Sequence, residues 1–424
     1  MIAIASAKSF LWSMQGRVNF VRVFVTTQNT LVQRDQLMLA SKRPQIALLV
    51  DTATDWGRRI IRGIARYSQE QGGWHLWLEQ RCQHAPGHLP SGWRGDGVIA
   101  RVADRSMARH LTASRSIVVN VSAARIPGVD FPTVTADLAV AARLAVEHLL
   151  NQGFRNFGYF SPLGLSYVEV HYESFVQTLA KAGHDCSLFA ARRSASPHAT
   201  WRKRQKNLQH WLKSLSKPVA ILTWTSDRGR EVLYACRELG LLVPEQVAVL
   251  GGDEDVLLCQ TCNPPLSAVA LTSERIGYEA AALLDRLLHG ARPPAASILI
   301  EPTRVVVRQS TNTLAINDRH LAQAIGFIRN HAAEPIQVSD ILSAAAMSRS
   351  SLERRFQQTL GRSPAEEIRR VRLERAKQLL ADTDMPVPEV ADASGFQSRE
   401  YMAYAFKRAT KMTPREYRAH TRGR

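Results

Sequence analysis

Short apolar runs alternate with helical patterns through the middle of this 424-residue chain, and this alternation constrains the fold more than any other feature. The strand-like runs lie at 46–50, 97–100, 117–121, 157–161, 220–224 and 247–251. Apolar residues at helical spacing occur at 58–71, 139–151, 172–182 and 228–239. Strands that alternate with helices form a parallel sheet covered on both faces, so the sequence predicts an α/β fold.

Composition narrows the class of protein further. The chain has 55 Lys and Arg against 37 Asp and Glu, and this net charge of +18 makes nucleic acid a candidate partner. No segment has the roughly 20 consecutive apolar residues of a membrane-spanning helix. The 5 cysteines are sparse, which favours a reducing compartment over a disulfide framework. We therefore expect a globular, cytoplasmic protein with no membrane partner.

The first 42 residues lack the periodicity of a helix or a strand. Gln15, Arg17 and Asn19 interrupt the apolar core that a signal peptide needs. We expect residues 1–42 to be a disordered leader or an over-extended start, with Met38 as a candidate initiator.

Polar and aromatic side chains follow several of the strand-like runs, where the ligands of parallel sheets bind. A carboxylate accepts hydrogen bonds from hydroxyl groups, and an indole offers an apolar face to a sugar ring, so these residues predict a site for a small polyol. Each Asp taken singly is also typical of a helix cap or a turn. The candidate ligand-binding residues at these ends are Asp55, Trp56, Arg58, Trp224, Thr225, Ser226, Asp227 and Asp253.

Residues 43–312 resemble the effector domain of LacI-type regulators. The resemblance lies in LAVEHLLNQGFRNFGYF at 144–160, VPEQVAVLGGDED at 243–255, PPLSAVAL at 264–271, ERIGYEAAALLDRLL at 274–288 and VVVRQST at 305–311. It implies a sensor of two α/β lobes, shared with periplasmic sugar-binding proteins, with a hinge and a ligand in the cleft. It also implies that Asp253 and residues 225–227 face that ligand.

Two positions depart from the LacI-type pattern. His171 lies four residues before Phe175, where such domains often carry an arginine that clamps hydroxyl groups. Thr225 and Ser226 stand where Asn-Asp or Thr-Asp is usual, and Asp227 is displaced by one residue. In extended backbone, a shift of one residue turns the side chain away from the pocket. We include His171 among the candidate ligand-binding residues and leave the identity of the effector open.

From residue 313 onward the chain has helical patterns without strand signals. We assign 313–335 to a linker and a first helix, and 336–420 to two further helical units. Ser339 is the expected N-cap of the next helix. A turn at 347–348 then leads to a helix in which Leu352, Phe356 and Leu360 face inward. Two helices joined by a short turn, with a basic outer face on the second, predict a helix-turn-helix.

The same pattern occurs a second time. Residues 387–393 lead through a turn at Gly395 to a helix at 398–410, with Met402 and Phe406 inward. One long helix is predicted at 365–382 between the two units. Two recognition helices on a rigid connecting helix can enter successive major-groove segments about 34 Å apart.

Residues 318–420 closely resemble the AraC/XylS-type DNA-binding domain. The residues that carry this resemblance are Gly395, Phe396, Tyr401, Phe406, Lys407, Pro414, Tyr417 and Arg418, with Lys411 where a glycine is usual. Arginine reads guanine edges and glutamate accepts from cytosine, although an outward arginine can equally contact a phosphate or form a surface ion pair. The candidate DNA-binding residues are Arg349, Ser350, Glu353, Arg354, Arg399, Glu400, Tyr404 and Lys407.

A LacI-type sensor followed by an AraC/XylS-type domain resembles the architecture of bacterial xylose-operon activators. The resemblance implies a transcription regulator that binds a double-stranded DNA operator, responds to a small sugar (D-xylose by analogy) and recruits RNA polymerase. Closure of the cleft on the sugar would change the geometry of a homodimer. We expect no enzymatic activity, cofactor or metal.

Two alternatives remain open at this stage. Cys259 and Cys262 form a lone CxxC motif. A metal site, a redox site or a Cys-dependent alkyl-transfer repair protein would need further cysteines near such a motif. The other alternative keeps the regulator but gives it a different pentose, a non-sugar effector or no ligand.

Overall fold

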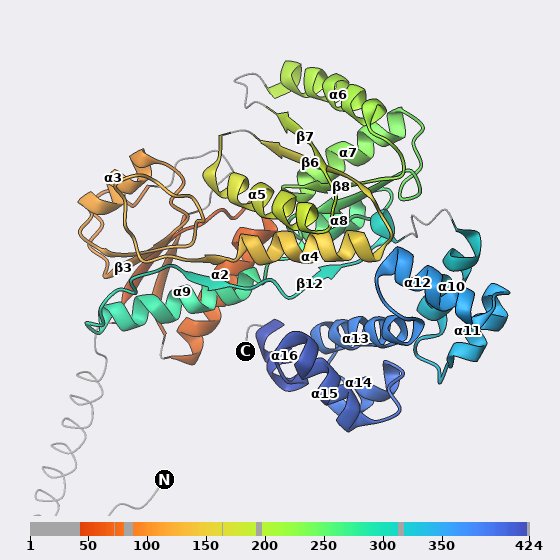
Figure 1. Cartoon of the computed structure of the whole chain (residues 1–424). Helices are drawn as coiled ribbons and strands as arrows, with labels where there is room; N and C mark the ends of the chain where they lie inside the picture. The colour runs from red at the N-terminus through yellow and green to blue at the C-terminus, as the bar shows by residue number, and fades with distance from the viewer. Residues whose placement is uncertain are drawn as a thin grey trace, which may run out of the picture.

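The structure, a computed structural model, describes residues 43–71, 73–79, 88–162, 164–191, 197–312 and 318–421. The predicted leader at 1–42 and Met38 lie outside these residues. Two α/β lobes precede a helical domain with two helix-turn-helix units (Figure 1). The predicted fold class, a two-lobed periplasmic-binding-protein-like sensor followed by an all-α double helix-turn-helix domain, is confirmed.

The first lobe is built on a parallel sheet with the strand order β2-β1-β3-β4. Its helices α2 and α9 approach closely because Gly63 and Gly277 lie at their contact. A Cβ at Gly63 would come within 1.9 Å of the Glu274 carbonyl oxygen, and one at Gly277 within 2.0 Å of the Ile60 carbonyl oxygen. The elements are β1 (Gln45–Leu49), α2 (Asp55–Glu70), β2 (His75–Leu78), β3 (Gly97–Ala100), α3 (Arg105–Ala113), β4 (Ile117–Asn120) and α9 (Ser273–Leu288).

The second lobe is a larger sheet with the order β12-β10-β9-β8-β6-β7, in which β12 alone among these strands runs antiparallel. Residues of β6, β8 and β9 are almost fully buried, which explains their continuous apolar runs. The strands are β6 (Asn156–Pro162), β7 (Cys186–Ala191), β8 (Val219–Thr223), β9 (Val247–Gly251), β10 (Ser267–Ala270) and β12 (Arg304–Val306). The helices are α4 (Leu138–Asn151), α5 (Ser166–Lys181), α6 (Pro197–Ser214), α7 (Ser226–Glu238), α8 (Val256–Thr261) and the 3-10 turn η1 (Gln309–Thr311).

A short parallel pair of strands, β5 (Val134–Ala136) and β11 (Ile298–Ile300), lies where the chain passes between the lobes. The Asp137 backbone N–H donates to the Ile300 carbonyl at 2.9 Å. The Asp137 side chain caps α4 by accepting from Ala139 N and Val140 N, both at 3.0 Å. Helix α4 therefore starts at this crossing and runs along the second lobe (Figure 1).

The helical domain lies below α4 in Figure 1, and α13 and the later part of α4 line one cavity. Two apolar cores fill the domain, one under α10–α12 and one under α14–α16. Its helices are α10 (Arg319–His331), α11 (Val338–Ala345), α12 (Arg349–Leu360), α13 (Pro364–Asp382), α14 (Val387–Ala393), α15 (Arg399–Thr410) and α16 (Pro414–Thr421). None of the described helices is both long and apolar enough to span a membrane.

Several details differ from the sequence-based predictions. Ser339 is not an N-cap: α11 starts at Val338, and the Asp340 carboxylate accepts from Gln337 N at 2.7 Å, so Gln337 takes the cap position. Helix α5 begins at Ser166 rather than at 172, which puts His171 inside its second turn. The strands β2, β5, β7, β10, β11 and β12 were not predicted, since a run of three to six residues leaves little periodicity. The helices α3 and α8 were not predicted either.

Candidate functional site

In the second lobe, the turn after β8 binds the half-buried carboxylate of Asp253, which follows β9. Thr225 caps α7, and the next residue, Ser226, donates its backbone N–H to Asp253 Oδ1 at 2.7 Å. Burial raises the pKa of Asp253 to about 6, although its hydrogen bonds with Ser226 act in the opposite direction. Ser226 thus fixes Asp253 by hydrogen bonds rather than by charge. A hydrogen-bonded carboxylate of this kind is an acceptor for ligand hydroxyl groups.

Aromatic side chains of the second lobe cluster around Trp224, in the same turn as Ser226. The Trp224 ring lies 5.4 Å from the ring of Tyr167 and 5.4 Å from that of His171. Trp224, Tyr167 and Trp56 of α2 all pack against the apolar core of the first lobe. We call this region, with Arg59 and Glu254, the lobe junction. His171 is 1% exposed, and its Nδ1 lies 2.7 Å from the Tyr159 hydroxyl.

An ion pair also links the lobes at this junction. Arg59 of α2 pairs with Glu254 at 3.5 Å, and Arg308 approaches the same carboxylate at 2.6 Å. Arg59 also pairs with Asp55 at 2.8 Å. The Arg101 guanidinium pairs with Asp51 at 2.6 Å and lies 5.6 Å over the Trp56 ring.

The structure brings together most of the predicted ligand-binding residues but not all of them. Trp56, His171, Trp224, Ser226 and Asp253 surround the lobe junction, with Asp55 and Thr225 at its helix starts. The Arg58 side chain is exposed and donates to the Thr52 carbonyl at 3.1 Å. The Asp227 side chain is 49% exposed and pairs with Arg230 at 2.8 Å, which agrees with the expected effect of its one-residue displacement.

Sequence reasoning missed four residues of the junction. These are Arg59, Arg101, Tyr167 and Arg308. Tyr167 follows β6 closely and fits the rule that strand ends form the site, so this signal was available. The three arginines could not be assigned because their carboxylate partners are distant in the sequence.

The recognition helix of the first unit, α12, has a polar outer face. Ser348 caps it by accepting from Ser351 N at 3.4 Å. Arg349, Ser350, Glu353 and Arg354 are all exposed on α12, as expected for residues that face a partner. Arg349 Nε donates to Glu353 Oε1 at 3.1 Å, so the acid on this face is held by its neighbour one turn away.

The recognition helix of the second unit, α15, has a more aromatic outer face. Its predicted residues Arg399, Glu400, Tyr404 and Lys407 are exposed, and Tyr404 has 61% of its surface accessible. Ser398 caps the helix and donates its hydroxyl to Glu400 Oε2 at 2.8 Å.

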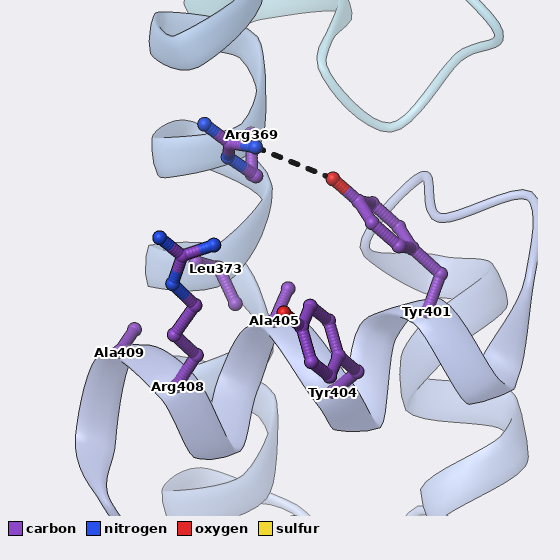
Figure 2. Close-up of a pocket in the computed structure, with 7 residues that line it drawn as sticks. All are labelled: Arg369, Leu373, Tyr401, Tyr404, Ala405, Arg408 and Ala409. Carbon is purple, nitrogen blue, oxygen red and sulfur yellow. Dashed lines mark hydrogen bonds between the residues drawn. The ribbon is translucent and has the colours of Figure 1, made fainter.

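A groove of about 310 Å³ lies between α15 and the connecting helix α13 (Figure 2). Arg369 of α13 donates to the Tyr401 hydroxyl at 3.4 Å across it. Apolar side chains form its floor between two guanidiniums and two phenol rings. The lining residues are Arg369, Leu373, Tyr401, Tyr404, Ala405, Arg408 and Ala409. Sequence reasoning placed only Tyr404 of these on the DNA-binding face.

The helical domain contacts the sensor at the carboxyl end of α4. Arg329 of α10 donates to Gln152 Oε1 at 2.7 Å and to the Asn151 carbonyl at 3.2 Å. Burial, and then the charge of Arg370, lower the pKa of Arg329 to about 10. Arg304 of β12 forms a bidentate pair with Asp382 of α13, at 2.6 and 3.2 Å. We call these interactions the domain contact.

A buried ion cluster supports the domain contact from inside the helical domain. Glu367 is fully buried and accepts from Arg362 at 2.6 Å and from Arg370 at 2.7 Å. Burial alone would raise the pKa of Glu367, but Arg370 and Arg362 hold it below its usual range. Arg362 also donates to Asn151 Oδ1 at 2.7 Å, so one arginine joins this cluster to the sensor.

Comparisons with known proteins agree with this division of the chain. Residues 45–141 match an XylR N-terminal domain, 146–311 a periplasmic binding protein-like domain and 341–420 a helix-turn-helix domain. The xylose operon regulatory protein of Escherichia coli (strain K12) is 30% identical over 385 residues, covering 89% of this chain and 97% of that protein. The protein of the same name from Haemophilus influenzae is 31% identical over 386 residues, covering 88% and 98%.

Solved structures give the same result. A structure described as the xylose-binding transcription activator xylR matches with a TM-score of 0.58 at 30% identity, covering 89% of this chain and 98% of that chain. A LacI family transcriptional regulator from Mycobacterium smegmatis, at 20% identity and a TM-score of 0.52, shares the sensor fold and covers 64% of this chain and 99% of its own.

A two-lobed sensor joined to two helix-turn-helix units defines a DNA-binding transcription regulator. The matches that cover most of the chain identify a family within this class. The chain belongs to the family of xylose operon regulatory proteins. Its relatives are transcription regulators and not enzymes, so the predicted non-enzymatic function is confirmed.

The environment of Cys259 in the CxxC motif does not favour nucleophilic or metal chemistry. Cys259 is buried, its Sγ lies 3.2 Å from Ser226 Oγ, and burial raises the pKa of the Cys259 thiol to about 11. A protonated, inaccessible thiol is a poor nucleophile and a poor metal ligand. Among the described residues, no group of three or more His, Cys, Asp or Glu side chains could hold a metal ion.

Proposed function

We propose that this regulator is an activator that responds to D-xylose and recruits RNA polymerase. The observation that carries the proposal is the match to xylose operon regulatory proteins along both the sensor and the DNA-binding domain. We assign the effector sensor to 43–312, the linker and first helix to 313–335 and the remaining DNA-binding domain to 336–420. We further propose that it acts in the cytoplasm, where an operator would be accessible, and as a homodimer.

The lobe junction supports a sugar as the effector. Asp253 is a hydrogen-bond acceptor without a guanidinium partner in the described contacts, and Trp224, two residues before the Ser226 that binds Asp253, has an indole that offers an apolar face. A pyranose needs both kinds of group, because it has hydroxyls at its edge and apolar C–H groups on its face. Asp55, Trp56, His171, Thr225 and Ser226 complete the proposed site, with Arg58 and Asp227 at its outer rim.

The exposed faces of α12 and α15 support binding to operator DNA. We propose that base edges are read by Ser350, Glu353, Arg354, Arg399, Glu400 and Tyr404, with Arg349 and Lys407 beside them. Arg369 and Arg408 on the two sides of the groove in Figure 2 would contact phosphates. A homodimer would present four such helices to repeated half-sites.

The domain contact supports a route from effector to DNA. Helix α4 begins at the crossing between the lobes and ends under Arg329, so a lobe movement that tilts α4 moves the carbonyl group that Arg329 binds. Sugar binding would thereby favour one orientation of the helical domain. Such coupling is reciprocal, so the operator must tighten sugar binding by the factor by which sugar tightens operator binding.

The first experiment is a thermal-shift panel of pentoses, hexoses and sugar acids on the full chain. D-xylose alone should raise the melting temperature, because a ligand that binds only the folded state stabilises it. The Asp253→Ala variant should lose this shift, and Glu238→Ala, which removes an exposed carboxylate at the carboxyl end of α7, should keep it. A shift with another sugar and none with D-xylose would contradict the proposed effector.

A second measurement tests activation and coupling. Operator affinity with and without D-xylose, and transcription from that operator with RNA polymerase, should both rise with the sugar. Replacing Asp382 with alanine breaks its bidentate pair with Arg304 and should reduce the sugar's effect on operator affinity. An unchanged effect would show that the coupling does not pass through this ion pair.

A further inference from the structure

One ring nitrogen of His171 lacks a hydrogen-bond partner although the residue is buried. His171 is 1% exposed, and its Nδ1 is bonded to the Tyr159 hydroxyl at 2.7 Å. Its Nε2 is also buried and has no hydrogen-bond partner among the described residues. The ring lies edge-on to Trp224, with centroids 5.4 Å apart, so the histidine borders the lobe junction. An unsatisfied buried polar group is costly, which points to a partner supplied from outside the chain.

The bond to Tyr159 decides which nitrogen carries the proton. His171 Nδ1 is the only hydrogen-bond partner that the described residues offer to the Tyr159 hydroxyl, so the phenolic proton is donated to Nδ1. Burial raises the pKa of Tyr159, which keeps that proton on the phenol. Burial also lowers the pKa of His171 to about 4, so the imidazole is neutral near pH 7. A neutral imidazole that accepts at Nδ1 carries its own proton on Nε2.

The guanidiniums at the lobe junction are already paired with carboxylates. Arg59 contacts Glu254 at 3.5 Å, Arg308 contacts the same acid at 2.6 Å, and Arg101 contacts Asp51 at 2.6 Å. Arg58, at the rim, lies 3.7 Å from Asp55. Asp253 is instead held by Ser226. The polar groups left for a ligand are therefore a carboxylate that accepts and an imidazole N–H that donates, and neither is a cation.

We propose that His171 is a specificity-determining residue that donates Nε2–H to an oxygen of an uncharged sugar, in a tautomer fixed by Tyr159. The inference rests on the proposed sugar effector and adds the chemical class that the site accepts and the class that it rejects. The LacI-type pattern has a charged arginine at this position, whereas His171 brings no charge. A sugar acid or a sugar phosphate would bring a negative charge next to Asp253 and Glu254, with no unpaired cation among the described junction residues to neutralise it, so the site excludes it.

Calorimetric titration of the full chain with D-xylose and with its carboxylate counterpart D-xylonate tests the ligand class. The wild-type protein should bind D-xylose and bind D-xylonate at least about a hundredfold more weakly, because an unpaired buried charge is costly. D-xylonate binding as tight as D-xylose binding would overturn the inference.

Two variants at the same position test the donor. The amide of His171→Asn reaches the position of Nδ1 and keeps a partner for Tyr159, but it has no donor at the position of Nε2. The longer His171→Gln carries an amide nitrogen near the position of Nε2. We expect D-xylose affinity to fall about tenfold in His171→Asn and to stay within about threefold of wild type in His171→Gln, as for the loss or retention of one hydrogen bond. Wild-type affinity in His171→Asn would overturn the proposed donor.

The tautomer is tested without a sugar. Long-range proton–nitrogen spectra of histidine-labelled protein, with the His171 signals assigned by their loss in His171→Gln, should show the proton on Nε2. Tyr159→Phe should give a mixture of tautomers. A proton on Nδ1 in the wild-type protein would overturn the inference. Failure of the wild-type protein to bind any neutral sugar, with operator binding intact, would instead overturn the proposed effector function on which it rests.

Discussion

Each helix-turn-helix unit has left-handed backbone at two positions, the turn between its helices and the end of its recognition helix. One of the two positions is a glycine in each unit, but it is not the same position in both. In the first unit, the turn between helices has Ala346 at a φ of 49°, and the recognition helix ends at Gly361 with a φ of 67°. In the second unit, the turn has Gly395 at 82°, and the recognition helix ends at Lys411 with 61°. Left-handed backbone costs a residue with a Cβ roughly 1–2 kcal/mol. Each unit therefore has one relaxed position and one strained position.

The outer faces of the two units differ as well. On α12 the Arg349–Glu353 pair offers hydrogen-bonding groups suited to base edges. On α15 two tyrosines flank the groove shared with α13. The comparison suggests that the first unit discriminates between bases by charge and hydrogen bonds, while the second adds contacts with the sugar-phosphate backbone.

The largest effect is expected from Gly395→Ala. A Cβ there would come within 2.1 Å of the Ala332 carbonyl oxygen, in addition to the left-handed φ. We expect the second unit to lose about 3 kcal/mol of stability, as strain and overpacking add. Hydrogen exchange of the amides in α14 and α15 would measure it. The matched control is Gly361→Ala, which has a positive φ but nothing within 4 Å, and should cost only about 1 kcal/mol. Equal losses would show that the contact with Ala332 does not matter.

Removing the charge of Glu353 should separate the two faces. Glu353→Gln keeps the size of the side chain but removes an acid that repels phosphate, so affinity for random DNA should rise. Affinity for the operator should not rise with it, and the ratio of specific to non-specific binding should fall about tenfold, the equivalent of one base contact. Arg408→Ala, which removes a guanidinium beside the groove of the second unit, should weaken binding to both DNAs. If both variants changed the two affinities in the same way in competition titrations, the proposed difference between the units would be wrong.

Arg369→Ala tests the groove of the second unit. If this guanidinium contacts one phosphate, its loss should reduce the slope of log affinity against log salt concentration by about 1, for the operator and for random DNA alike. Arg292, exposed on the sensor, provides the control, and its alanine variant should leave the slope unchanged. A change in base preference without a change in slope would assign Arg369 to base reading instead.

The smallest effect is expected from Lys411→Gly. It relieves left-handed strain in the native state but increases the chain entropy of the unfolded state, so the net gain should be about 0.5 kcal/mol. Lys411→Ala keeps the Cβ and should bring no gain. Thermal unfolding would distinguish the two variants, and a gain from alanine would mean that the lysine charge, rather than the backbone, is responsible.

The DNA-binding domain could be predicted more fully than the sensor site. A recognition helix can be predicted from inward apolar residues at helical spacing, such as Met402 and Phe406. The outward residues then follow from the geometry of the helix. The lobe junction depends instead on contacts between distant segments, such as Ser226 with Asp253 and Arg59 with Glu254. Spacing along the chain cannot reveal such pairs. Even in the helical domain, the choice of Gln337 over Ser339 as N-cap depended on a local competition that propensity does not resolve.

Strand β12 gives the order of the domains a further consequence. It is the outermost strand of its sheet, so one side of its backbone has no strand beside it. Its first residue, Arg304, is tied to Asp382, and the preceding Thr303 carbonyl accepts from Tyr417 at 3.3 Å. The helical domain thus covers a sheet edge that would otherwise be open to pairing with another chain. A sensor cut off at the linker would lose this protection, so its tendency to self-associate would reflect the truncation and not the oligomeric state of the regulator.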